Sequence, residues 1–145
     1  MTTLDEFVAL ARPELFLMTV ATARADGTIQ ASLVNAGVMD HPVDGTPVVA
    51  FVTYGKAKLG NLRVRPQITL TVRSGWRWAT VEGRAEIIGP DDPHSAVDRE
   101  RLRLLLREVF TAAGGTHDDW EAYDAEMVQP GRSAVLVTPA RVYSN

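Results

Sequence analysis

Six segments rich in β-branched and aliphatic residues follow one another along the chain, and short turns join most of them. Two of the turns carry Asp26-Gly27 and Asp44-Gly45, dipeptides that are typical of tight turns between antiparallel strands. A parallel sheet needs a helical crossover between paired strands, and most of these connections are too short for one. The pattern therefore favours a small, closed antiparallel barrel over a doubly wound sheet. The segments are 15–23, 28–39, 47–54, 67–73, 76–88 and 133–143.

Helical signals lie before, within and after this series of strands. Thr3 and Glu6 form a capping-box pattern at the start of a helix that Pro13 closes. A short helix is expected from about Lys56 to Val64, between two strands. Two further helices are expected before the last strand, one from an Asp92-Pro93 cap to Gly114-Gly115 and one capped at Thr116 and Asp119.

Length and composition exclude several classes of protein. The 145 residues are expected to form one domain, residues 1–145. The net charge of −3 indicates no general attraction to nucleic acid or to an anionic membrane. Because the chain has no cysteine, disulfides, thiolate nucleophiles and cysteine-bound metals are excluded. The acidic start and the lack of an apolar run near ~20 residues predict a soluble, cytoplasmic protein.

The only two lysines of the chain, Lys56 and Lys58, lie two residues apart at the start of the short helix. A helix start carries unpaired N–H groups and the positive end of the helix dipole. Together with Asn61 and Arg63 one turn later, the lysines can form a pocket for a phosphate or a carboxylate. A solvated basic turn explains the same residues, and the pattern alone leaves both interpretations open. Neither a P-loop nor a GxGxxG motif is present.

A Trp-Arg-Trp sequence opens the fifth segment. If the strand includes both tryptophans, Trp76 and Trp78 share a face with polar residues, whereas Ala79 and Val81 lie on the opposite, core-facing side. Large apolar side chains on a polar face need a cover. A partner subunit or a flat aromatic ligand is a better candidate for this cover than one of the chain's own helices.

No residues form a recognisable catalytic set. The three histidines, His41, His94 and His117, lack metal-ligand spacing, and no metal site is expected. No serine lies in a GxSxG sequence, and no pair of carboxylates suggests an acid and a base. The catalytic residue is therefore unassigned, and a cofactor would have to carry the chemistry of any enzyme built on this chain.

Four stretches together resemble a known family: KAKLGNLRVRP, GWRWATVEGRAEI, HDDWEAYDAEMV and SAVLVTPARVY. They are similar to flavin and deazaflavin oxidoreductases of the split β-barrel, pyridoxamine-phosphate-oxidase-like superfamily. The branch that the chain most resembles uses coenzyme F420 in actinobacteria. The resemblance implies a mainly β (α+β) fold, with a six-stranded antiparallel split barrel, a few peripheral helices, and a homodimer holding its coenzyme between the subunits.

The resemblance also implies a set of cofactor-binding residues. Lys56 and Lys58 would hold the phosphate of the coenzyme, helped by Asn61 and by the backbone at Leu62. The ring and its ribityl-like chain would be lined by Gln30, Ser32, Val34 and Thr53. The partner subunit would contribute Trp76 and Trp78 as a wall for the ring.

The implied activity is hydride transfer from reduced F420 to an unsaturated or conjugated small organic substrate. An FMN-dependent oxidoreductase and a non-catalytic protein that stores F420 are the alternatives. A nucleic-acid-binding barrel is a weaker one, because the net charge is negative. Pyridoxamine-phosphate oxidases carry an Arg-x-His near the C-terminus, whereas this chain has Arg141-Val142-Tyr143. Oxidation of vitamin B6 is therefore not expected.

Overall fold

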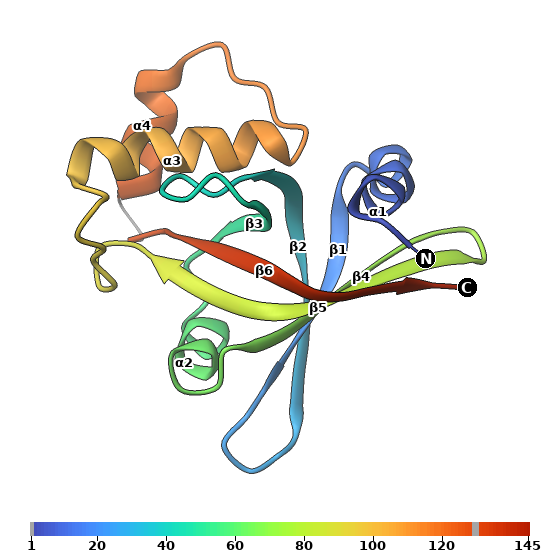
Figure 1. The fold of residues 1–145 in the computed structure, drawn as a ribbon. Helices are drawn as coiled ribbons and strands as arrows, with labels where there is room; N and C mark the ends of the chain where they lie inside the picture. The colour runs from blue at the N-terminus through green and yellow to red at the C-terminus, as the bar shows by residue number, and fades with distance from the viewer. Residues whose placement is uncertain (1, 129–130) are drawn as a thin grey trace.

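The computed structural model describes residues 2–128 and 131–145. Six antiparallel strands close into a barrel in the order β1-β2-β3-β6-β5-β4, which confirms the expected fold class (Figure 1). The strands are β1 (Leu17–Ala23), β2 (Ile29–Asp40), β3 (Pro47–Thr53), β4 (Gln67–Ser74), β5 (Arg77–Ile88) and β6 (Ser133–Ser144). The helices are α1 (Leu4–Ala11), η1 (Arg12–Glu14), α2 (Lys56–Val64), α3 (Arg99–Ala112) and α4 (Trp120–Val128).

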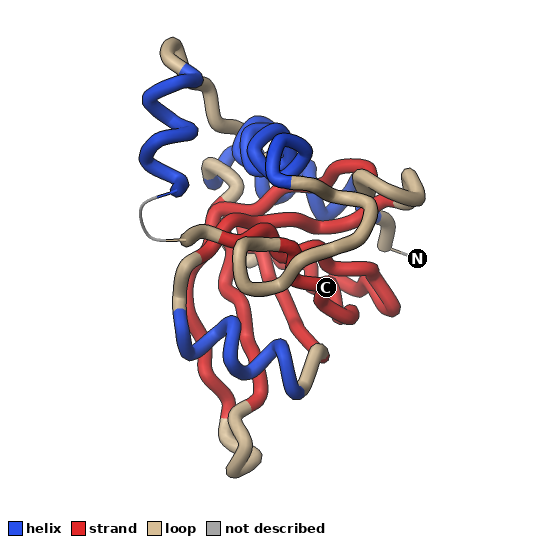
Figure 2. Tube along the Cα trace, turned by 90° about the vertical axis from the view of Figure 1, so that its left-hand side faces the viewer, coloured by secondary structure: helices blue, strands red, loops and turns tan. Residues whose placement is uncertain are grey.

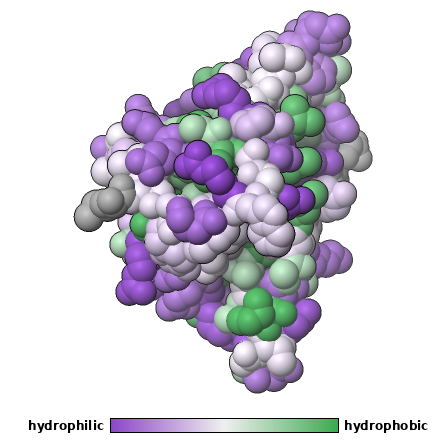
Figure 3. Space-filling model, turned by 90° about the vertical axis from the view of Figure 1, so that its right-hand side faces the viewer, coloured by the Kyte–Doolittle hydropathy of each residue, from purple (hydrophilic) through white to green (hydrophobic). Residues whose placement is uncertain are grey.

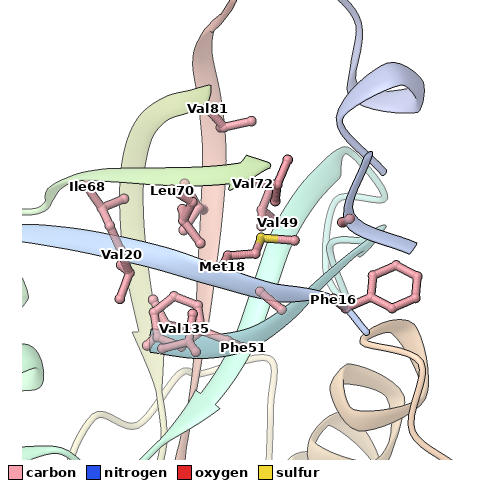
Figure 4. Packing of buried hydrophobic residues seen from close by; sticks show 14 of the residues in the cluster. Phe16, Met18, Val20, Val49, Phe51, Ile68, Leu70, Val72, Val81 and Val135 are labelled. Atoms are coloured by element: carbon pink, nitrogen blue, oxygen red, sulfur yellow. The ribbon is translucent and has the colours of Figure 1, made fainter. Parts of the chain in front are cut away.

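The interior of the barrel is filled by alternate residues of its strands. In β4, Ile68, Leu70 and Val72 are buried while the residues between them are not, as expected for a strand with one face in the core. Met18 and Val20 of β1 lie against them, and β3, β5 and β6 supply the other side of the cluster (Figure 4). The alternation in the sequence therefore marks the face that each strand turns inward.

Strand β3 and the first half of β6, residues 133–137, differ because both of their faces are buried. Val49 and Phe51 point into the barrel, whereas Val48 and Ala50 belong to a second cluster with α3, α4 and the outer side of β6. The sequences of β3 and of the first half of β6 are accordingly almost continuously apolar rather than alternating. Helices α3 and α4 cover this side of the barrel, and α2 lies toward the β1–β2 hairpin, away from them (Figure 2).

Two helices complete the barrel core. Phe7 and Ala11 of α1, and Leu59 and Leu62 of α2, are buried in the same cluster as the strands. The start of α1 is capped as expected, since the Thr3 hydroxyl accepts a hydrogen bond from the N–H of Glu6 at 3.2 Å. Within residues 2–128 and 131–145, no helix is long and apolar enough to cross a bilayer.

Strand β2 changes its partner between Asn35 and Ala36. Residues 29–35 pair with β1, whereas residues 36–40 pair with β3. The last residues of β3, Val52 and Thr53, pair only with β6. The edge of β2 opposite β1 is therefore not paired with β3 over its first half, and we call this opening the split.

Two boundaries differ from the sequence prediction. Helix α3 begins at Arg99 with Asp98 as its cap, so the predicted cap at Asp92 is wrong. The carboxylate of Asp92 instead binds Arg63, and the segment around it forms isolated β-bridges. Strand β5 begins at Arg77, because a turn with a left-handed glycine precedes it, and Trp76 lies in that turn.

The backbone of α3 approaches the barrel closely at Gly37 of β2. A Cβ atom there would lie 2.1 Å from the carbonyl oxygen of Ala112. Since backbone atoms cannot yield as a side-chain tip can, Gly37→Ala is expected to lower the free energy of unfolding by about 1–3 kcal/mol. Chemical denaturation of the variant measures this loss.

Gly60→Ala is the matched control, because a Cβ at Gly60 of α2 would meet nothing within 4 Å. Alanine favours a helix over glycine by about 0.5–1 kcal/mol, so this variant should be as stable as the wild type or more stable. Equal stabilities of the two variants would contradict the close approach.

Candidate functional site

The start of α2 collects positive charge without a counter-charge. Gly55 is its N-cap, and the N–H groups of the first turn belong to Lys56, Ala57 and Lys58. The first turn contains no acidic residue. Cations at the positive end of a helix are unfavourable, whereas an anion there is stabilised by about 0.3–1 kcal/mol. This helix start is thus built for a negatively charged group.

Lys58 is the residue of this segment that most needs an anion. Its side chain is only 8% exposed. Burial lowers the pKa of its ammonium group, and no carboxylate of the described chain counteracts that effect. A buried charge without a partner is costly. Lys56, by contrast, is exposed.

A small cradle adjoins the ammonium group of Lys58. A Cβ atom on Gly55 would lie 3.9 Å from Lys58 Nζ and 3.4 Å from Thr53 Oγ1. The Thr53 hydroxyl accepts the N–H of Gly55 at 3.1 Å, which holds the turn into α2. A hydroxyl, an ammonium group and a backbone without a side chain therefore meet at one place, as a bound phosphate requires.

The two arginines that follow the lysines in the sequence, Arg63 and Arg65, bind other parts of the chain. Arg63 forms a forked ion pair with Asp92, with Nε 2.9 Å from Oδ2 and an NH2 nitrogen 2.6 Å from Oδ1. Arg65 donates from Nε to the carbonyl oxygen of Ala23 at 2.9 Å. The expectation that Arg63 joins the anion pocket is therefore wrong. The arginines tie α2 to its neighbours, and the lysines remain for a ligand.

A polar chain links α2 to the first hairpin. The Thr22 hydroxyl donates to Gln30 Oε1 at 3.2 Å and accepts from Asn61 Nδ2 at 3.1 Å. Gln30 and Asn61, both predicted site residues, are thus brought together by Thr22, which the sequence reasoning missed. The available signal was the alternation of β1, since Thr22 occupies an inward position after Met18 and Val20.

Ser32 and Val34 lie on the inward face of β2, along the split. Val34 is buried in the core cluster. The hydroxyl oxygen of Ser32 is buried and has no hydrogen-bond partner among the residues that the structure describes. Buried polar atoms are normally satisfied, so this hydroxyl is available to a ligand in the split.

The side chain of Leu62 packs in the core, and the predicted role of its backbone stays a prediction. Its side chain is 3% exposed and belongs to the barrel core. It lies more than one turn into α2, where N–H groups are normally bonded within the helix. The first turn, from Lys56 to Lys58, offers better backbone donors for an anion than Leu62 does.

The two tryptophans are not brought to the lysines of their own chain. Trp76 is 94% exposed, and Trp78 contacts the ring of Tyr143 edge-on, with centroids 6.0 Å apart. The side chain of Asn145 bridges their backbones, accepting from the N–H of Trp78 and donating to the carbonyl of Trp76. Strand β4 separates this turn from α2, and eight extended residues span roughly 25 Å.

A cavity of about 320 Å³ lies beside the split, between β2, β3, α3 and α4. It begins at Asn35 and Val52, next to the predicted site residues Val34 and Thr53. Arg132 lines it and lies over the ring of Tyr54, 4.6 Å from the centroid. A larger cavity of about 790 Å³ lies farther from the split, between the segment before α3 and the two helices.

Two other titratable groups, those of Tyr123 and His41, form contacts within the fold. The hydroxyl of Tyr123 donates to the carbonyl oxygen of Leu106, and burial raises its pKa to about 12, so it stays protonated at neutral pH. His41 binds Glu86 at 2.7 Å. No group of metal-ligating residues suited to a metal ion occurs in the part of the chain that the structure describes.

Known proteins share this fold. A conserved hypothetical protein of Mycobacterium tuberculosis has a TM-score of 0.68 and 20% identity, covering 99% of this chain and 84% of its own. An F420 reductase has a TM-score of 0.56 and 20% identity, covering 88% of this chain and 89% of its own. An FMN-binding protein from Nostoc punctiforme, related to pyridoxamine 5'-phosphate oxidase, has a TM-score of 0.62 and 15% identity, covering 99% and 86%.

At these identities the structural likeness establishes a common fold. The family model for pyridoxamine 5'-phosphate oxidase matches residues 4–145, which include all six strands and the four α-helices. The superfamily suggested by the lysine and tryptophan motifs is thereby confirmed. The chain belongs to the pyridoxamine 5'-phosphate oxidase family.

Proposed function

We propose that this chain is an F420-dependent reductase that acts as a homodimer. The observation that carries the proposal is Lys58, a residue that is 8% exposed, has no counter-charge in the described chain and lies beside the free N–H groups of α2. A phosphate-bearing coenzyme supplies the missing charge. The F420 reductase of the same fold supports the choice of coenzyme.

The residues along the split fit the remaining parts of such a coenzyme. Its phosphate would be held by Lys56, Lys58 and the N–H groups of the first turn of α2. The unpartnered hydroxyl of Ser32 is free for a polar atom of the ring or its side chain. Gln30 and Asn61, held in place by Thr22, line the path between them.

Reduced F420, when bound, supplies a hydride to an electrophilic carbon of an unsaturated or conjugated small molecule. The protein contributes orientation and a site from which bulk water is excluded. The second hydrogen of the reduction is a proton, and water is its expected source. FMN is the alternative cofactor, supported by the FMN-binding protein of the same fold.

Exposed apolar residues on the outer face of the barrel, opposite α3 and α4, support a homodimer. Leu33 and Ile29 on β2 are 63% and 59% exposed, and Leu17 on β1 is 43% exposed. Small residues such as Ala21 and Thr19 lie between them, which makes this part of the sheet flat enough for a second copy. Apolar surface is visible on the right-hand side of the molecule (Figure 3).

A dimer also gives the tryptophans a role. Trp78 projects from the same outer face, at the far end of the barrel from its own lysines. A two-fold partner would bring these indoles over the neighbouring split, where they could wall a flat ring. Each coenzyme site would then draw on both subunits.

The first test removes the charge of Lys58 but keeps a side chain of similar length. Lys58→Met is expected to weaken binding of F420 and of FMN at least tenfold, since a charge-assisted hydrogen bond contributes ~1.5–3 kcal/mol. The stability of the free protein should be unchanged or higher, because an unpaired buried charge is removed. Fluorescence titration and thermal melting measure the two effects.

Lys56→Met is the matched control, because Lys56 is exposed and its replacement should have little effect on stability. If Lys58→Met destabilises the free protein and leaves both affinities unchanged, the ammonium group is structural and the phosphate role is lost.

The second test concerns the subunit interface. Each Leu33 side chain buried contributes about 1.5–3 kcal/mol, and a two-fold interface buries two of them. Leu33→Asp should therefore raise the dimer dissociation constant at least about a hundredfold, and coenzyme affinity should fall with it. Analytical ultracentrifugation measures the association. Leu104→Asp on α3, also exposed, should leave the dimer intact, and a monomeric wild type would refute the interface.

Turnover separates a reductase from a coenzyme store. Reduced F420 bound to the protein is expected to be reoxidised when conjugated enones are added, at a rate that depends on the enone concentration. A protein that binds F420 tightly but gives no reoxidation with any acceptor would be a storage protein instead.

A further inference from the structure

The 320 Å³ cavity beside the split has properties that the coenzyme does not explain. Its lining combines polar side chains with apolar and aromatic ones, among them Val52, Val109, Phe110, Tyr123 and Met127. It borders the split directly, because Asn35 and Val52 flank the point at which β2 and β3 separate. A molecule in this cavity lies next to whatever occupies the split.

Arg132 lines this cavity together with the polar residues Asn35, His117 and Glu126, and it also lines the larger cavity. Its Nε atom is buried and has no hydrogen-bond partner within the described ranges 2–128 and 131–145. No carboxylate lies within 4.0 Å of its guanidinium group there, unlike Arg103 and Arg107, which share Asp124. A buried, unsatisfied N–H of a charged group is costly. Its planar fork matches the two oxygens of a carboxylate.

The position of Arg132 is fixed by long-range pairing. It precedes Ser133, which pairs with Thr53 at the end of β3. Its guanidinium group lies over the ring of Tyr54, which holds the group by a cation–π interaction. The fork is therefore oriented before any ligand arrives.

Two other titratable residues line the cavity. His117 Nδ1 accepts the N–H of Asp119 at 3.0 Å, so in the neutral ring Nε2 carries the proton and can donate to a ligand oxygen. Glu126 is exposed and contributes a negative charge. It disfavours a second anionic group on the ligand. Arg107 and Asp124 nearby neutralise each other, with Nε 2.9 Å from Oδ1.

We propose that this cavity binds the substrate, and that the substrate is a planar, conjugated monocarboxylate whose carboxylate pairs with Arg132. The aromatic walls accept the flat part of the molecule, and the cavity's border with the split places its double bond beside the coenzyme. The assignment of the ligand as the substrate rests on the proposed reductase function. The binding of a carboxylate at Arg132 does not, because the cavity is formed by this chain alone.

The test compares trans-cinnamate with trans-cinnamamide, which has the same shape without the charge. Binding of each to the full chain is followed by NMR titration, without coenzyme and then with F420. Cinnamate is expected to bind the wild type at least tenfold more tightly than the amide. Arg132→Gln should remove this preference, and Arg132→Lys should retain only part of it, since lysine lacks the fork.

Arg84→Gln is the matched control, because Arg84 is an exposed arginine outside both cavities. It should leave the preference for cinnamate unchanged. Circular dichroism of each variant confirms that it is folded. Equal affinities of cinnamate and cinnamamide for the wild type, or a preference that survives Arg132→Gln, would overturn the proposal.

The same experiment separates this proposal from the proposed function. If cinnamate binds through Arg132 but F420 and FMN do not bind, the anion site stands and the reductase assignment fails. If the coenzyme binds with equal affinity to the wild type and Arg132→Gln while cinnamate shows no preference, the reductase assignment stands and this substrate class is wrong.

Discussion

The change of partner by β2 is the constraint on which the site depends. Its first half pairs with β1 and its second half with β3, so the barrel is held closed while one edge of β2 stays unpaired beside the end of β3. Three groups that could bind a ligand border that opening: the start of α2, the hydroxyl of Ser32, and the small cavity at Asn35. Asn35 stabilises the junction, since its amide nitrogen donates to the carbonyls of Leu15 and Ala113. It thereby joins the start of β1 to the end of α3.

Arginines and lysines near the split have different roles. Arginines make forked or directional bonds within the fold, as Arg63 does with Asp92 and Arg65 with a backbone carbonyl. The lysines form no such bond in the described chain, and the burial of Lys58 lowers the pKa of its ammonium group. A compact ammonium group on a flexible stem can adjust to a phosphate that arrives later. The scarcity of lysine in the sequence thus has a physical basis at one helix start.

The sequence predicts well what local patterns determine. Alternation and turn dipeptides predicted the strands, and the two lysines, two residues apart, predicted a candidate anion site. It missed Thr22, Tyr54 and Arg132, because their proximity to the split depends on pairing between strands far apart in the chain, such as Thr53 with Ser133. The wrong helix start has the same origin. Asp92 reads locally as a cap, but its carboxylate is bound by Arg63, 29 residues away in the sequence.

Two regions beside the split differ in chemistry, and this difference bears on the choice between a reductase and a storage protein. A store needs only an anchor for the coenzyme, which the start of α2 provides. The chain also has a second cavity, lined by both apolar and polar residues, with a guanidinium group whose Nε has no hydrogen-bond partner among the described residues. A buried donor without a partner lowers stability, and a coenzyme anchored by its phosphate at α2 gives no reason for it. A second ligand beside the coenzyme does, and two ligands in contact are what hydride transfer requires.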